Sequence, residues 1–265
     1  MIPNAVSFER RTVDELTIGD ERSFRHVALY SDLKAILRRS RYPFRILPKT
    51  PPARTDRALL LNLTFWAPDE GGDVLVDLHI EADVVAHAAW HHLAARAFAT
   101  HPGRPPSVHA LFLGEAIASA FDVYLVGRLL GHAPRSTFLE TQVPAMAEAA
   151  FAAGLSEDGF ERLLEQIAAD PDCAFRDLRE LLYDATRAVF ACDGCEEAYA
   201  ALVDFDGHRF SPLLHRYEIS NWVLYARAHG DRDGVDSRVR DVDLALRQGD
   251  ALGWLGANWI DPAMA

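Results

Sequence analysis

The chain has 265 residues, of which 39 are acidic and 27 are basic, so its formal net charge at pH 7 is -12. This excess of negative charge repels the phosphate backbone of nucleic acids, and we therefore expect no nucleic-acid partner. Hydrophobic residues make up 49% of the chain, a proportion that is ordinary for globular proteins and excludes a largely disordered one.

No apolar run in the sequence approaches the roughly 20 residues that a membrane-spanning helix requires. The N-terminal sequence MIPNAVSFERR also lacks the hydrophobic stretch of a signal peptide. We therefore expect a cytoplasmic protein without membrane contact, and the presence of only three cysteines agrees with this expectation.

The first part of the chain favours short, irregular elements. Residues 1–25 are polar and predict an irregular segment, and residues 31–40 have the apolar spacing of a short helix. Two segments then have the character of strands: ALLLNLTFW at 58–66 is apolar, and DVLVDLHI at 73–80 alternates apolar and polar residues. Together they predict a small β-hairpin near residues 58–80.

From about residue 82 the hydrophobic period changes to that of helices. Residues 82–99 are rich in alanine, and residues 107–131 follow with Ser107 as the expected N-cap. Further helices are predicted at 137–153, 156–169, 174–191, 195–203, 212–229 and 236–249, and residues 250–265 are expected to form a tail packed on the body. The sequence thus predicts one α+β, mostly α-helical domain over residues 1–265, in which a multi-helix bundle follows the hairpin.

Two histidines on the first long helix have the spacing of metal ligands. His87 and His91 are four residues apart, which places both imidazoles on one helical face about one turn from each other. Glu115 belongs to the next predicted helix, after a short proline-rich turn, and can supply a carboxylate to the same ion. Two imidazoles and one carboxylate suit catalytic zinc or, as the second choice, non-haem iron(II).

Other polar residues near this set are candidates for supporting roles. Asp122 lies about two turns after Glu115 on the same stripe, with Ser119 between them, and either could orient a ligating histidine. His92 points about 100° away from His91, so we expect it to act as an acid or base rather than as a ligand. His92 and Asp122 are therefore the candidate catalytic residues.

Histidines elsewhere provide alternative ligands. His79 precedes the histidine-rich helix, and His109 lies before Glu115 on the following one. His215 and Glu218 have the i, i+3 spacing of helical two-metal sites, although a polar stripe on an amphipathic helix explains the same spacing more simply.

The arrangement resembles the metal-binding helix pair of the gluzincin, or thermolysin-like, metallopeptidases over about residues 73–125. In that family a strand precedes a helix carrying HExxH, and a downstream helix supplies a glutamate from a segment similar to GEAIASAF here. The resemblance implies that His87, His91 and Glu115 are the metal ligands. The chain departs from the pattern at Ala88, where the family has its general-base glutamate, and this departure puts peptidase activity in doubt.

These observations predict a divalent-metal-dependent enzyme with a hydrolytic or lyase-like reaction on a small molecule or a peptide-like substrate. A non-haem iron oxygenase is one alternative. A metal-free helical binding or scaffold protein, in which the histidine-rich helix is structural, is the other. The sequence leaves open whether the protein forms an oligomer.

Overall fold

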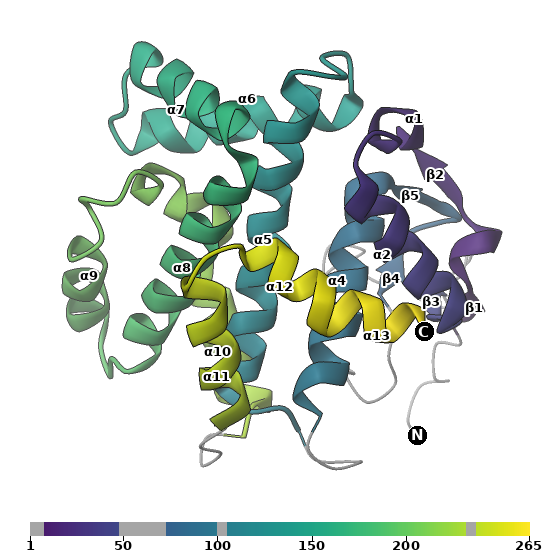
Figure 1. The fold of residues 1–265 in the computed structure, drawn as a ribbon. Coiled ribbons are helices and arrows are strands. Elements are labelled where there is room, and N and C mark those ends of the chain that lie inside the picture. The colour runs from purple at the N-terminus through teal and green to yellow at the C-terminus, as the bar shows by residue number, and fades with distance from the viewer. Residues whose placement is uncertain (1–7, 48–72, 100–104, 232–236) are drawn as a thin grey trace.

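The computed structural model of the protein describes residues 8–47, 73–99, 105–231 and 237–265. Helices dominate and a few short strands lie beside them, so the predicted α+β, mostly helical class is confirmed (Figure 1). The longer helices are α2 (Ala28–Arg39), α4 (Ala82–Phe98), α5 (Val108–Leu130), α6 (Thr137–Ala152), α7 (Glu157–Ala169), α8 (Pro171–Phe190), α9 (Cys195–Val203), α10 (Ile219–His229) and α11 (Ser237–Arg247). Buried hydrophobic side chains from Val13 to Ile260 form one cluster.

The strands form two small sheets at one side of the helices (Figure 1). In the first, β3 (Phe44–Ile46) pairs antiparallel with β1 (Glu9–Arg11) and parallel with β4 (Val74–Leu75). In the second, β2 (Thr17–Gly19) pairs parallel with β5 (His79–Glu81). Because α4 begins at the residue after β5, the second sheet fixes where the histidine-rich helix starts.

The predicted β-hairpin near residues 58–80 is wrong in its second half, and residues 58–66 lie outside the described part of the chain. Residues 73–80 do not form one strand, because β4 and β5 belong to different sheets. The division falls at Asp77, whose carboxylate Oδ1 accepts a hydrogen bond from the backbone N–H of His79 at 2.7 Å. Such a local side-chain bond competes with strand pairing and turns the backbone.

The structure also corrects the expectation of an irregular segment over residues 1–25. Its described part contains β1, the 3-10 turn η1 (Val13–Glu15), β2 and the short helix α1 (Glu21–Phe24). The strands escape sequence analysis because they are only three residues long and their partners are remote in the chain. Sheet pairing of this kind depends on the neighbouring strands more than on local propensity.

Helices α4 and α5 are antiparallel neighbours in the middle of the molecule (Figure 1). The predicted cap of α5 is confirmed, because the Ser107 hydroxyl accepts a hydrogen bond from the Ala110 N–H at 3.1 Å. By length and composition α5 could cross a membrane, although no such segment was expected from the sequence, but 89% of its most apolar window is buried inside the protein. The other helices thus cover α5 as a core helix.

At Gly127, α5 lies against the end of α7 and the first residue of α8, Pro171. A Cβ atom at this position would lie 2.5 Å from the Ile167 carbonyl oxygen, so only glycine permits this approach. Helix α11 is tied to α8 by an ion pair between the fully buried Arg179 and Asp243. These contacts hold the second half of the chain against the central helix pair.

Of the two predictions for the C-terminal part, one needs correction. The single helix expected over 212–229 is divided into the 3-10 segment η3 (Ser211–Tyr217) and α10, with Glu218 between them at a left-handed φ of 47°. The tail expected over residues 250–265 does pack on the body, and it is helical: it consists of α12 (Ala251–Leu255), the π-helical turn η4 (Gly256–Ile260) and α13 (Asp261–Met264). In this segment the Trp259 ring packs edge-on against Phe98 of α4, with 5.5 Å between the ring centroids.

Candidate metal centre

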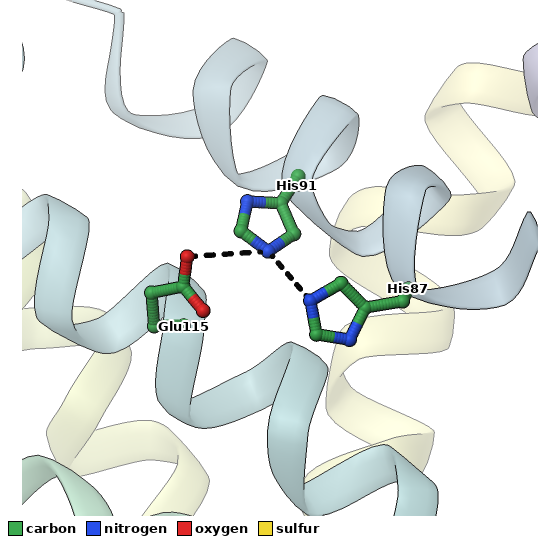
Figure 2. Close-up of side chains that lie close together, drawn as sticks. All are labelled: His87, His91 and Glu115. Carbon is green, nitrogen blue, oxygen red and sulfur yellow. Dashed lines mark hydrogen bonds and ion pairs between the residues drawn. The ribbon is translucent and has the colours of Figure 1, made fainter. Parts of the chain in front are cut away.

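His87 and His91 lie together on the face of α4 that is turned toward α5 (Figure 2). Their imidazole rings are stacked, with centroids 4.8 Å apart and an angle of 29° between the ring planes. The two Nε2 atoms are 3.0 Å apart. This is the geometry that the four-residue spacing predicts for neighbouring turns of one helix.

Glu115 approaches the same point from α5 (Figure 2). Its Oε1 is 3.5 Å from Nε2 of His91, and its side chain is only 10% exposed. The residue before it helps to bring the helices together, since a Cβ on Gly114 would already lie 3.2 Å from the Ala94 Cβ. A buried carboxylate is thereby held beside two imidazoles.

The three side chains converge closely enough to hold one ion. One ligand atom from each of His87, His91 and Glu115 can be chosen so that all lie within 4.8 Å of one another. Two nitrogen ligands bound tetrahedrally at ~2.05 Å are about 3.4 Å apart. A contraction of at most about 1.4 Å in the widest separation would therefore give the spacing of a bound ion.

Burial controls the charge of all three groups. It lowers the pKa of His87 to about 4, with a further lowering by His91 and an opposing effect of Glu115. It also lowers the pKa of His91, against the influence of the Asp73 carboxylate. For Glu115, burial raises the pKa to about 7, and His87 opposes that change. At neutral pH the imidazoles are thus neutral, which is the state that binds a metal ion.

Ala88 lies on α4 between the two histidines and carries no group that could accept a proton. Its exposure is 1% and it belongs to the hydrophobic core. If the centre carries out proton transfer, the proton acceptor must come from another position.

The two residues considered as acids or bases lie outside the three-residue cluster. The ring of His92 packs edge-on against Tyr42, with 5.3 Å between centroids, and its buried Nε2 has no hydrogen-bond partner among the described residues. Burial lowers the pKa of His92, and the nearby Arg96 lowers it further. Asp122 is half-buried on α5, and burial together with Asp83 raises its pKa well above the usual range.

The alternative ligands do not join the cluster. Nε2 of His79 lies 2.7 Å from Oε1 of Glu81 on the surface. His109 instead lines a shallow pocket of about 490 Å³ formed with α8. His215 and Glu218 are exposed. Because the chain breaks before α10, they do not lie on one continuous helix, which the i, i+3 spacing of a two-metal site requires.

Two further residues influence the site but were not singled out from the sequence. Asp83 precedes His87 by four residues, so the spacing that links the histidines also extends to this aspartate. Asp73 lies just before β4, and the negative charge of its carboxylate favours a higher pKa for His91. Nothing in the sequence signals this second relation, because it depends on how the strands pack beside α4.

Comparisons with models of known protein families, with curated proteins and with solved structures found no match to this chain. The interpretation of the site therefore rests on its own geometry and electrostatics.

Proposed function

We propose that the protein is a divalent-metal-dependent enzyme whose metal ion is bound by His87, His91 and Glu115. The observation that carries the proposal is the convergence of two neutral imidazoles and one buried carboxyl group, whose ligand atoms lie within 4.8 Å of one another. A buried ionisable group is costly to maintain without a partner, and a bound cation would offset the cost at Glu115.

Zinc is the first choice and iron(II) the second. Two histidines and one carboxylate leave coordination positions open for water and substrate, as catalytic zinc sites require. The same donors form the facial triad of non-haem iron enzymes. Zinc would support hydrolysis or a lyase-like reaction by polarising a bound carbonyl group or lowering the pKa of water, whereas iron(II) would support oxidation of a small molecule.

The protein's own residues contribute binding geometry and exclusion of water. Glu115 and His91 belong to different helices, so the close packing of α4 and α5 fixes the position of the carboxylate relative to the imidazoles. Trp90, next to His91, is fully buried, and its ring packs against Phe121 of α5 at a centroid distance of 5.4 Å. This apolar packing beside the polar set keeps the local dielectric low and strengthens its electrostatic interactions.

Reconstitution of the chelator-treated protein tests the proposal. Protein loaded with Zn²⁺ should hydrolyse members of a panel of small esters, amides and peptides, and protein loaded with Fe²⁺ is monitored in parallel for oxygen consumption. Glu115→Gln should abolish the metal-dependent reaction, whereas His79→Ala, a change at an exposed histidine outside the cluster, should retain it. If neither metal binds the wild-type protein, the proposal fails, and a metal-free binding or scaffold role becomes the better account.

A further inference from the structure

Helices α4 and α5 pack very closely beside the metal centre. The contact is made by the side chain of Ala94 and the backbone of Gly114, both of which are buried. A Cβ atom on Gly114 would lie 3.2 Å from the Ala94 Cβ. Carbon atoms in ordinary contact are about 3.5–4.0 Å apart, so even a methyl group at position 114 is too large for the present spacing of the helices.

This contact lies next to two of the metal ligands. Gly114 immediately precedes Glu115 on α5. On α4, Ala94 follows His91 by three residues, which is about one turn. Figure 2 shows Glu115 reaching His91 across the boundary between the two helices, where Oε1 and Nε2 are 3.5 Å apart. The distance between the helices at Gly114 and Ala94 therefore sets how far the carboxylate lies from the imidazoles.

Only some of the distances within the ligand set depend on this packing. His87 and His91 lie on one helix, so the 3.0 Å between their Nε2 atoms does not change when the helices move apart. The distances from Glu115 to both histidines cross the helix boundary and increase with the separation. Zinc forms short bonds, about 2.0–2.2 Å to nitrogen and oxygen, so it requires the carboxylate to stay close. A larger cation with longer bonds tolerates a displaced carboxylate better.

We propose that Gly114 and Ala94 are positioning residues of the metal centre: their contact sets the distance between its two helices and thereby favours an ion with short bonds, such as Zn²⁺, over a larger one, such as Cd²⁺. The inference rests on the proposed metal-binding function and adds to it a determinant of ion preference. Neither residue has a side chain that can coordinate an ion, so a change at either acts on the ion through the position of the ligands.

The test compares the zinc and cadmium affinities of the wild type and Gly114→Ala, measured by competition with a chromophoric chelator. The added methyl group should lower the zinc affinity about tenfold or more and the cadmium affinity less than about threefold. Gly127→Ala is the matched control, because it makes the same change on the same helix but meets the Ile167 carbonyl oxygen of α7. It should destabilise the protein and leave the ratio of the two affinities unchanged.

A second substitution tests whether the contact with Ala94 is the cause. Apart from the chain neighbours of Gly114 and the backbone of its own helix, the Ala94 Cβ is the only heavy atom of the described residues within 4 Å of the added Cβ. Ala94→Gly should therefore restore the zinc affinity of Gly114→Ala to within about threefold of the wild type. The absorption spectrum of bound Co²⁺, which reports the coordination geometry, should change in Gly114→Ala and return toward that of the wild type in the double variant.

The possible results separate this inference from the function on which it rests. If the wild-type protein binds neither zinc nor cadmium, both fail. If the wild type binds zinc, the inference alone is overturned when Gly114→Ala loses both affinities equally or retains both, or when Ala94→Gly does not restore zinc binding. Should Gly114→Ala not fold on its own, the double variant still decides, because an affinity ratio different from that of the wild type contradicts the proposed role of the contact.

Discussion

Replacing Glu115 with glutamine should make the metal-free protein more stable relative to the wild type as the pH rises. In the wild type, the pKa of Glu115 is raised by burial from its ordinary value of 4.5 to about 7. Between these values the folded state binds more protons than the unfolded state, so the stability that Glu115 contributes is present below pH 4.5 and is lost as the pH rises through 7. The lost free energy is about 3 kcal/mol, at 1.36 kcal/mol for each tenfold change in acidity.

His87 has the opposite pH dependence in the same range. Its pKa is lowered from 6.5 to about 4, so the folded state binds fewer protons than the unfolded one between these values, and stability is lost as the pH falls. In the wild type the two slopes largely cancel between pH 4.5 and 6.5. Glu115→Gln removes one of them, and the dependence on His87 should then become visible.

The measurement is urea denaturation in the presence of a chelator, followed by fluorescence of the five tryptophans over a series from pH 4 to 8. The free energy of unfolding of Glu115→Gln minus that of the wild type should rise by about 3 kcal/mol across the series. Glu161→Gln, at an exposed glutamate of α7, is the matched control and should give a flat difference. A flat difference for Glu115→Gln as well would refute the reasoning.

Three further predictions follow from single contacts. His91→Ala should weaken zinc binding at least about 100-fold, whereas His92→Ala, which removes a ring outside the cluster, should change it less than about threefold by calorimetry. Gly127→Ala should destabilise the protein by about 1–3 kcal/mol in urea titrations, because its Cβ meets a backbone carbonyl, whereas Gly131→Ala meets nothing and should be close to neutral. Ser107→Ala removes the cap of α5 and should cost about 1 kcal/mol, and an unchanged unfolding midpoint would contradict that role.

Most of the helical architecture could be predicted from the sequence, because helices are determined by local signals. The boundaries of α4 and α5 differ from the predicted ones by only a residue or so, and Ser107 is the cap in both descriptions. The convergence of His87, His91 and Glu115 could also be anticipated, since it needs only helical spacing and a short connection. Each of these predictions depends on residues that are near one another in the chain.

The errors concern features that depend on remote segments or on unusual backbone. The strands β1 and β2 pair with residues far along the chain, so their polar sequences give no local signal. The break at Glu218 requires a left-handed backbone at a residue that usually avoids it, and helical periodicity continues across the break. In the site, the Asp73 charge influences the pKa of His91, and the Asp83 charge influences that of Asp122. Both effects become evident only when the packing of strands and helices around α4 is known.

The central claim is that His87, His91 and Glu115 bind one divalent metal ion, and the zinc content of the purified protein after equilibrium dialysis tests it most directly. The account predicts about one zinc ion per chain in the wild type and in His79→Ala, and loss of that zinc in His87→Ala and Glu115→Gln. A wild-type protein without zinc, or variants that retain as much as the wild type, would contradict it.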